Sequence, residues 1–591
     1  MLGCSLPPRS SFVPWWGTLA LVAWGATASS RLVAQAPSAE AFRANHAWVD
    51  PLGIPLALSG NFGELRGNHF HTGIDLKTQG REGVPVLAAT SGRVARVKMS
   101  PWGYGNALYL EGPEGITTVY AHLQSFSPEV QAWAVQRTYK GRTLGLDASP
   151  SPENAFRFAA GDTLGWSGNS GSSGGPHLHF EVRETASQHP LNPLDGWVTK
   201  PDSRPPTLGT LWVETADGVL VPCAPGDTVA VHGTWRASVE GFDLLDGANN
   251  VCGIRTLHAR IWQDSSVLAT HAFTLDELDF SVNKDMNAHT LYPVWASSRA
   301  QVHRLHRLTA NRLGIYESPV DESWIQGATG KVASVEVEVT DAAGNATAQT
   351  WWVRQLPGTP ASTPPPLLAL ARPETAGTWA AANERVRLSW GKGTFFEETF
   401  VGWEAGASPW EGRLMPEDAP YRKPVTVTWE LPAEGNSLSG FLGAYPATPL
   451  PRDRWVLVRR DADGELDEVV QARWNDGGVV ASLPDGGLWR IERDTVPPEV
   501  KPYHSGTPLV ANGDAVWFVD DALSGVDALE AHLDGAWMRL VWDPKRRMVT
   551  YQGTDALHTV GEPHVVELRV TDASGNVASW SRTLTWPLAA K

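Results

Sequence analysis

The chain has 591 residues, of which 42% are hydrophobic and 19% charged, and its formal net charge is −16. This length suffices for about three to five domains, each with its own core. The composition excludes a largely disordered chain, and the acidic balance argues against a general nucleic-acid binder. The 28 Trp are an unusual number. Because antiparallel sandwiches commonly bury Trp, we expect most of them in the cores of strand-rich modules.

The first 36 residues have the pattern of a secretory signal. Arg9 precedes an apolar run over residues 12–28, and small-x-small sites follow at residues 26–28 and 34–36. A positive start, an apolar centre and a small-residue cleavage site direct export. A single N-terminal membrane anchor is the alternative. No later segment holds about 18 uninterrupted apolar residues. We therefore expect an exported bacterial protein, periplasmic or at the cell surface, with no transmembrane segment in the mature chain.

Cysteine usage gives one expectation. Cys4 would leave with the signal, so that Cys223 and Cys252 remain. An even number in an exported chain predicts a disulfide between them. Two buried free thiols are the alternative.

Most of the chain alternates between apolar and polar residues and is punctuated by Gly, Pro, Asn and Asp. Examples are SVEVEV at 334–339, PVTVTW at 424–429 and WVLVRR at 455–460. This period of two predicts an all-β protein made of antiparallel sheets. One helix is expected at residues 127–137, where Ser127 suits the N-cap, Pro128 the first helical position, and Val130, Trp133 and Ala134 one face.

Two stretches repeat along the chain. VTDAAGN at 339–345 matches VTDASGN at 570–576, and an Asp-x-x-Pro-Pro lies upstream of each, at 202–206 and 494–498. Because both regions begin with the same Asp-x-x-Pro-Pro motif and have the same turn sequence near their ends, we predict two related immunoglobulin-like β-sandwich modules. Each Asp-Ala-x-Gly-Asn suits a tight hairpin turn, since Gly and Asn tolerate positive φ. Calcium binding by these aspartates is the alternative, although neither stretch spells out a full loop of oxygen ligands.

These signals divide the chain into six parts. They are a signal peptide (1–36), a catalytic domain (37–201), a β-sandwich module (202–356) with an insertion around 283–326, a Pro-rich linker (357–366), a β-rich module (367–493) and a second sandwich (494–591).

The residues suited to catalysis lie in the first 200 positions, in three separated motifs. They are NHFHTGID at 68–75, TVYAHL at 118–123 and GGPHLHFE at 174–181. In a strand, residues two apart point to the same face, so His177 and His179 would project side by side, with Leu178 and Phe180 in the core.

The first two motifs extend this set. His71 and Asp75 add an imidazole and a carboxylate, which together with a His-x-His pair are the ligand types of a catalytic zinc. His122 adds a further imidazole at the end of a predicted strand. One metal site accounts for the histidines of all three motifs, whereas a structural role would have to be assumed separately for each motif.

The three motifs resemble those of the lysostaphin/LytM-type zinc metalloendopeptidases, peptidoglycan hydrolases with a His-x-x-x-Asp…His-x-His signature. The resemblance is collinear and includes every metal and catalytic position of that family. It runs through HTGIDL at 71–76, residues 83–97, residues 102–110, TVYAHL at 118–123 and residues 168–182. The sandwich modules that follow resemble those of large exported members.

The resemblance implies a role for each matching residue. His71, Asp75 and His179 would bind Zn²⁺ and leave a fourth position open, as a catalytic site requires. His122 and His177 would be the catalytic pair, which orients or deprotonates a metal-activated water and donates hydrogen bonds to the developing oxyanion. Which of the two is the base is left open.

Other residues near the motifs have less certain roles. His69 could replace His71 as a ligand, but only His71 stands four residues before Asp75, so we expect His69 to line the groove. Tyr104 and Asn106 either line the groove or serve a turn and a strand start. The insertion at 127–157, which contains the predicted helix, could form a wall or lid over the cleft.

The function predicted is that of an exported zinc metalloendopeptidase acting on the peptide cross-links of peptidoglycan. The alternatives are a non-catalytic cell-wall-binding or hydrolase-activating protein, and an adhesion or glycan-binding protein that acts through its sandwiches. The complete ligand set favours the enzyme. The C-terminal modules could contact the cell wall or another protein, and no nucleic-acid partner is expected.

Overall fold

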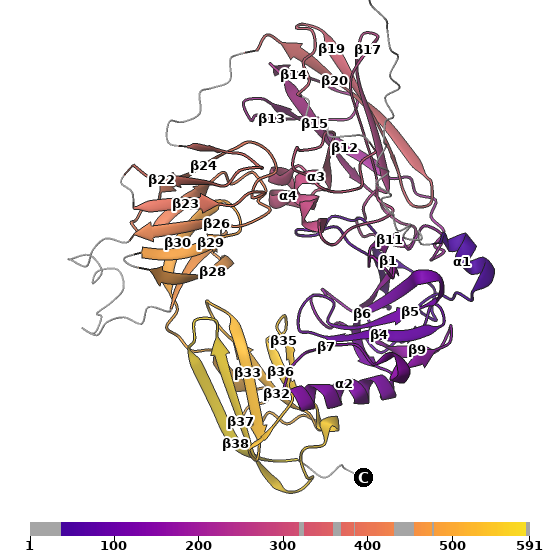
Figure 1. Cartoon of the computed structure of the whole chain (residues 1–591), viewed down its shortest axis with the longest axis vertical. Helices are drawn as coiled ribbons and strands as arrows, with labels where there is room; N and C mark the ends of the chain where they lie inside the picture. Colours follow the sequence, from indigo (N-terminus) through magenta and orange to yellow (C-terminus); the bar gives the residue numbers. More distant parts are fainter. Residues whose placement is uncertain are drawn as a thin grey trace, which may run out of the picture. The chain divides into compact units, whose positions relative to one another are not determined.

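The computed structural model describes residues 37–317, 324–358, 368–382, 385–430, 454–461, 463–475 and 478–586. The predicted signal peptide, with Cys4, lies outside these residues, as does most of the predicted Pro-rich linker. Strands dominate and helices are few (Figure 1), which confirms the all-β prediction. In the described part of the chain, no helix has both the length and the apolar character needed to cross a membrane.

The N-terminal domain is built on one sheet, in which three strands distant in sequence are neighbours. Its main path runs β1-β2-β10-β6-β5-β4-β7, while β11 pairs with β10, β8 with β4, and β9 with both β3 and β6. The bounds are β1 (Leu58–Gly60), β2 (Ile74–Lys77), β3 (Pro85–Leu87), β4 (Gly92–Met99), β5 (Asn106–Glu111), β6 (Ile116–Phe126), β7 (Leu146–Ala148), β8 (Arg157–Phe158), β9 (Thr163–Ser167), β10 (His177–Glu184) and β11 (Pro190–Leu191). The central trio β2-β10-β6 brings the three histidine motifs together.

Two helices accompany this sheet. The short α1 (Ala39–Asn45) begins at Ser38, whose side chain accepts a hydrogen bond from the backbone of Ala41. The predicted helix is present as α2 (Pro128–Gly141), four residues longer than expected, with Ser127 at its N-cap. It buries Val130 and Ala134 and packs against β6 and β7. The 3-10 turns are η1 (Pro113–Gly115) and η2 (Pro152–Asn154).

Residues 202–356 form two sheets around one core. Their orders are β13-β12-β15-β18 and β14-β20-β19-β16-β17, and the β14–β20 pair is parallel, an exception to the antiparallel pattern. The strands are β12 (Thr207–Thr215), β13 (Leu220–Cys223), β14 (Thr228–His232), β15 (Trp235–Phe242), β16 (Thr256–Gln263), β17 (Ser266–Thr274), β18 (Val302–Arg304), β19 (Val332–Thr340) and β20 (Ala346–Leu356). The predicted insertion holds η3 (Asn283–Asp285), α3 (Met286–His289) and α4 (Tyr292–Ser298).

This module shares its core with the N-terminal domain. Phe62, Leu65 and Phe70 are packed in the same cluster of buried side chains as Trp235, Trp351 and the other inward residues of the two sheets. The segment that leads to His71 is therefore anchored by residues far away in the sequence.

The next module has one continuous path of ten strands, β21-β24-β25-β30-β27-β28-β29-β26-β23-β22. Residues from both halves of the path share one core, so the sheet folds over on itself. The strands are β21 (Ala369–Ala371), β22 (Gly377–Ala380), β23 (Val386–Trp390), β24 (Thr399–Ala405), β25 (Glu411–Met415), β26 (Val425–Glu430), β27 (Trp455–Arg460), β28 (Leu466–Asn475), β29 (Gly478–Leu483) and β30 (Gly487–Arg493).

The last module is again two sheets, β31-β32-β36-β35 and β34-β33-β37-β38, around one core. Its elements are β31 (Glu499–Pro502), β32 (Ala515–Asp520), β33 (Val526–Leu533), β34 (Ala536–Trp537), β35 (Val541–Asp543), β36 (Met548–Tyr551), η4 (Gly553–Asp555), β37 (Pro563–Asp572) and β38 (Val577–Thr585). The exact module boundaries stay predictions.

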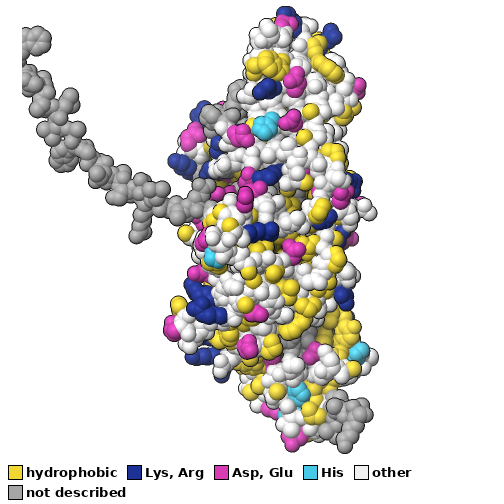
Figure 2. Space-filling view, turned by 90° about the vertical axis from the view of Figure 1, so that its right-hand side faces the viewer, with side chains coloured by type: hydrophobic (Ala, Val, Ile, Leu, Met, Phe, Trp, Pro, Cys, Tyr) yellow, Lys and Arg dark blue, Asp and Glu magenta, His cyan; other side chains and the backbone are white. Residues whose placement is uncertain are grey.

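The tryptophans are mostly in these cores, as expected. Trp235, Trp351, Trp489, Trp517 and Trp586 are among the largest fully buried side chains. Trp102 is an exception at 58% exposed. Acidic and basic side chains are interspersed over the face shown in Figure 2, a mixture that suits a water-exposed surface.

The predicted disulfide is wrong, because Cys223 and Cys252 are both buried free thiols. Leu211 of β12 pairs with Cys223 on one side and with Val239 of β15 on the other. Cys252 pairs with Asp243, which lies four residues beyond Val239. At about 3.3 Å per residue this offset alone is about 13 Å, well beyond the roughly 7 Å between Cα atoms that a disulfide can bridge.

Candidate metal centre

Sheet register brings the predicted ligands together. Asp75 on β2 and His179 on β10 are directly opposite each other in the antiparallel pairing, and His71 stands three residues before β2 begins. Leu178 and Phe180 are fully buried on the other face of β10, as the alternation predicts. Gly73 permits this approach, since a Cβ there would lie 2.4 Å from the Phe180 carbonyl oxygen and 3.0 Å from His179 Nε2.

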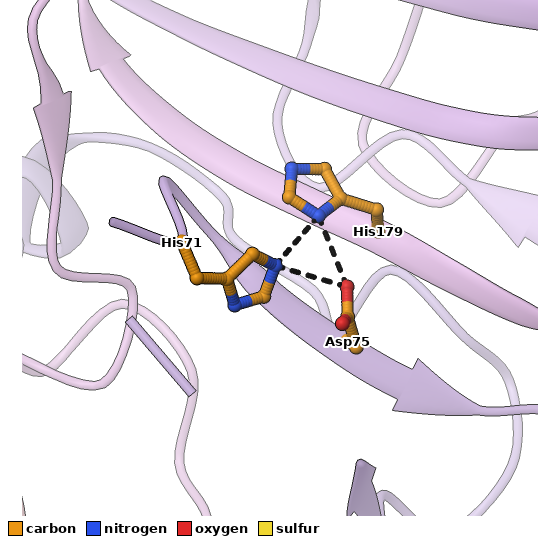
Figure 3. A group of neighbouring side chains, drawn as sticks. All are labelled: His71, Asp75 and His179. Atoms are coloured by element: carbon orange, nitrogen blue, oxygen red, sulfur yellow. Dashed lines mark hydrogen bonds and ion pairs between the residues drawn. The ribbon is translucent and has the colours of Figure 1, made fainter. Parts of the chain in front are cut away.

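Three donor atoms converge in the resulting site (Figure 3). His71 Nε2 lies 2.9 Å from His179 Nδ1 and 3.1 Å from Asp75 Oδ1, and His179 Nδ1 lies 3.0 Å from the same oxygen. All three side chains are buried. Two imidazoles and one carboxylate are the ligand types that zinc takes in catalytic sites.

Surrounding hydrogen bonds determine which nitrogen of His71 and of His179 faces the site. His71 Nδ1 lies 2.7 Å from the carbonyl oxygen of Asn61, which can only accept, so Nδ1 carries the proton and Nε2 the lone pair. His179 Nε2 lies 2.8 Å from Glu181 Oε1 and donates to it, which leaves the lone pair on Nδ1. His71 Nε2, His179 Nδ1 and a carboxylate oxygen thus face one another, and this arrangement calls for a cation, either a proton on His179 or a metal ion.

Asp75 is oriented in the same way. Its second oxygen, Oδ2, accepts a hydrogen bond from Arg66 at 2.7 Å, which turns Oδ1 toward the histidines. Burial opposes ionisation, but the neighbouring imidazoles of His71, His177 and His179 hold the pKa of Asp75 well below its usual value. The carboxyl is therefore ionised, as a metal ligand must be.

Glu181 is a functional residue that sequence reasoning missed. It is fully buried, and Oε1 accepts hydrogen bonds from His179, from the Tyr104 hydroxyl at 2.6 Å and from the Thr72 hydroxyl at 2.7 Å. Burial opposes its ionisation, but the charge of Arg183 and the hydrogen bonds lower its pKa below the usual value. The signal was available, since His179-x-Glu181 places both residues on one face of a strand.

The net effect on His179 is a gain of positive charge. Burial lowers its pKa, but hydrogen bonds to the carboxylates of Asp75 and Glu181 outweigh burial and raise the pKa to about 9. Two carboxylates thus favour a cation at Nδ1, which is the place where a metal would replace the proton.

His122 and His177 form a second pair beside these residues. Their ring centroids are 4.8 Å apart, and the His122 ring is 5.8 Å from that of His179. His122 Nδ1 donates to the carbonyl of Ser170 at 2.8 Å, and His177 Nδ1 to that of Gly175 at 2.8 Å. His122 Nε2 is therefore free to accept a proton, whereas His177 Nε2 lies 3.3 Å from Asp75 Oδ1. Burial, and then the charges of His177 and His179, lower the pKa of His122 to about 3, so this ring is neutral at neutral pH.

The backbone at His122 is unusual. Its φ is +58°, in the left-handed region that a non-Gly residue rarely adopts. Asn106 of β5 pairs with Leu123 of β6, and Leu108, two residues later, pairs with Tyr120, three residues from Leu123. The extra residue on β6 makes a bulge at His122. Bulges re-aim side chains next to active sites, and this one carries the His122 ring to His177.

The cleft above these residues has walls from two modules. It is lined by Arg66, Asn68, His69, His71, Thr72, Asp75, Gly103, Tyr104, His122, Ser172, Ser173, Gly174, His177, His179, Phe280, Asn283 and Lys284. His69 is therefore placed along the groove; its Nδ1 lies 3.0 Å from Asn68 Oδ1. Asn106 is not among these lining residues, and its side chain donates to the carbonyl of Leu123 between β5 and β6.

The insertion at 127–157 does not form the wall or lid that we expected. None of its described residues is among those that line the cleft, because α2 packs on β6 and β7 instead. Phe280, Asn283 and Lys284 of the 202–356 module take that place. No pattern in the sequence indicates this, since more than 200 residues separate them from the segment that they cover.

Asn283 holds the segment before His71. Its Oδ1 accepts from the backbone N–H of Phe70 at 3.0 Å, and its Nδ2 donates to the Phe70 carbonyl at 3.1 Å. Both side chains are buried.

The Asn283→Ala variant is expected to lose stability and zinc affinity together. It leaves two buried backbone groups of Phe70 unpaired, at about 1–3 kcal/mol each, next to His71. Thermal unfolding and zinc titration measure the two effects, and Asn154→Ala, at an exposed asparagine, is the matched control. Unchanged zinc affinity in Asn283→Ala would contradict this role.

Comparison with known proteins agrees with the geometry. Residues 69–153 match the model of Peptidase family M23, a range that includes His71, Asp75 and His122 and ends before His177. The N-terminal part of the chain is thus similar to peptidases of this family. The sandwich modules lie outside the matched range.

Individual relatives cover the same region. The DD-carboxypeptidase/endopeptidase Mpg of Neisseria meningitidis serogroup B is 34% identical over 132 residues, which are 22% of this chain and 24% of that protein. The glycyl-glycine endopeptidase ALE-1 of Staphylococcus capitis is 29% identical over 128 residues, 22% of this chain and 26% of that protein. The chain thus spans about a quarter of the length of these relatives. The catalytic domain of lysostaphin from Staphylococcus simulans is 23% identical, with a TM-score of 0.18, over 24% of this chain and 90% of that one.

Proposed function

We propose that the chain is an exported zinc-dependent endopeptidase that hydrolyses peptide bonds in the cross-links of bacterial peptidoglycan. The observation that carries the proposal is the donor set of His71, Asp75 and His179, whose three facing atoms lie 2.9–3.1 Å apart. The names of the two relatives describe peptide-bond cleavage, and the predicted signal over residues 1–36 supports export.

The chemistry divides between the metal and the protein. When bound, zinc would supply a Lewis acid that polarises a peptide carbonyl and acidifies water. His122 and His177 line the same cleft, and His122 Nε2 is free to accept a proton. One of the two accepts the proton of the attacking water at Nε2 and, once protonated, donates a hydrogen bond to the oxyanion that develops. Arg66 and Glu181 keep Asp75 and His179 in their orientations. A non-catalytic activator would have no need for a complete set of metal ligands and catalytic histidines.

The test is digestion of purified peptidoglycan by residues 37–591. New amino termini should appear when zinc is present, and a zinc chelator should stop their release. Absence of new amino termini in both conditions would overturn the proposal.

Lys284 is expected to contribute to substrate binding. Its exposed side chain lines the cleft, and peptidoglycan stem peptides carry free carboxylates. Lys284→Ala should raise KM for a stem peptide by about 2–5-fold, the worth of an exposed ion pair, with kcat nearly unchanged. Lys284→Arg should keep the parent KM. A drop in kcat without a change in KM would contradict a binding role.

A further inference from the structure

Three carboxylates meet at one end of the 202–356 module, outside the metal centre described above. Asp202 precedes β12, Asp243 follows β15 and Asp341 follows β19. One oxygen from each lies within 4.8 Å of the others. Because Ca²⁺ binds oxygens at about 2.4 Å, two oxygens on one ion are at most about 4.8 Å apart. This spacing allows all three to reach a single cation.

Two of the three carboxylates, those of Asp202 and Asp243, are incompletely hydrogen-bonded, whereas both oxygens of Asp341 accept hydrogen bonds. Asp243 is 0% exposed and Asp341 2% exposed. Asp243 Oδ1 accepts from the Leu244 backbone at 2.8 Å, but Asp243 Oδ2 and Asp202 Oδ2 are buried without a partner. Buried polar atoms are nearly always satisfied, and burying an unpaired charge is costly. Two orphaned oxygens in one acidic cluster therefore point to a missing positive charge.

Two nearby cationic side chains donate to backbone carbonyls instead of to the cluster. The Arg204 guanidinium donates to the carbonyl of Ala248, and Lys200, which lines the adjoining cavity, donates to those of Pro201 and Asp246. Burial, with the nearby carboxylates of Asp341 and Asp202, raises the pKa of Asp243 to about 7. A cavity lined by Asp202, Asp243, Ala342 and Ala343 opens beside the cluster and gives access to it.

We propose that Asp202, Asp243 and Asp341 bind a calcium ion. Three hard carboxylate oxygens, with no histidine or cysteine in the cluster, favour calcium over zinc. Calcium accepts irregular oxygen shells, with backbone carbonyls and water completing the coordination. This site is independent of the proposed peptidase activity.

The calcium site lies where the sandwich meets the peptidase domain. Asp243 and Cys252 exchange two backbone hydrogen bonds, of 2.9 and 2.8 Å. The side chain of Asn61 pairs with both backbone groups of the next residue, Gly253, at 2.6 and 2.7 Å. The carbonyl of Asn61 in turn accepts from His71 Nδ1. A calcium ion at Asp243 would therefore stiffen the support of a zinc ligand.

The last module contains a similar triad, Asp494, Asp521 and Asp572. In both modules the Asn of the repeated turn donates to the first Asp backbone, at 3.1 Å from Asn345 to Asp202 and 3.2 Å from Asn576 to Asp494. In the last module, however, both oxygens of Asp494 and of Asp572 accept hydrogen bonds. We therefore restrict the proposal to the first cluster, where carboxylate oxygens are orphaned.

The test is equilibrium dialysis of residues 37–591, loaded with zinc, against radioactive calcium. Asp243→Asn should bind one calcium ion fewer per chain than the parent, whose dissociation constant should be about 0.1–1 mM, as in extracellular calcium modules. Asp217→Asn, at an exposed aspartate of the same module, should bind as the parent does. Calcium at 5 mM should raise the unfolding temperature of the parent by about 4 °C and leave that of Asp243→Asn unchanged.

Asp202→Asn, at a half-buried position, is a second variant that keeps the test decisive if Asp243→Asn does not fold. It too should lose one calcium ion. Equal calcium uptake by the parent and the folded variants would overturn the proposal, as would full displacement of the ion by an equal concentration of Mg²⁺.

Discussion

Replacing His179 with alanine is expected to abolish zinc binding and, with it, peptidase activity. His179 Nδ1 is one of three converging donor atoms. Removing it should weaken zinc binding by more than the 10–100-fold typical of residues that only hydrogen-bond to a metal ligand. Glu181 keeps its bonds from Arg183, Tyr104 and Thr72, so the strand should remain folded. Metal analysis of dialysed protein should give about one zinc per parent chain and none in the variant.

His69→Ala is the matched control for this experiment. His69 lines the same cleft and lies next to Asn68 rather than facing Asp75, so this variant should keep its zinc. Stoichiometric zinc in His179→Ala would show that the ligand assignment is wrong. Loss of zinc from His69→Ala with retention in His71→Ala would show that the register chosen for the first motif is wrong.

Replacing His122 with alanine is expected to preserve zinc and remove turnover. Its ring lies beside His177 rather than among the three predicted ligands. Losing a general acid–base residue typically lowers the rate 10²–10⁴-fold. Zinc content and kcat on a cross-linked muropeptide, measured on the same preparation, separate the two effects.

The backbone at His122 calls for a second variant. Its φ of +58° is more easily adopted by Asn than by Ala, so His122→Asn tests the loss of the imidazole with less risk to the bulge. Both variants should hold about one zinc per chain. Wild-type kcat in a folded His122→Asn, or loss of its zinc, would contradict the assigned role.

Much of the metal site was predictable from the sequence because it depends on strand geometry. The alternation at 177–180 predicts His177 and His179 on one face, and the structure has Leu178 and Phe180 buried on the other. The four-residue spacing of His71 and Asp75 matched the family motif. By the same reasoning, Glu181 could have been assigned to the face of His179.

What could not be predicted depends on contacts between distant segments. Asn283 and Lys284 reach the cleft because Phe62, Leu65 and Phe70 share a core with the first sandwich, and no local pattern encodes that contact. The disulfide failed for a similar reason, since an even cysteine count carries no information on register. The helix at 128–141 was predicted from its cap and apolar face, but its packing partner was not.

The proposed peptidase activity is tested by mass identification of the muropeptides released from purified peptidoglycan, with the parent and His122→Asn compared at equal zinc content. The parent should convert each cross-linked muropeptide into products whose masses together exceed that of the muropeptide by one water per bond cleaved, with a new amino terminus within the peptide cross-link. His122→Asn should give no such products. Unchanged cross-linked muropeptides after incubation with the zinc-loaded parent would contradict the proposed function.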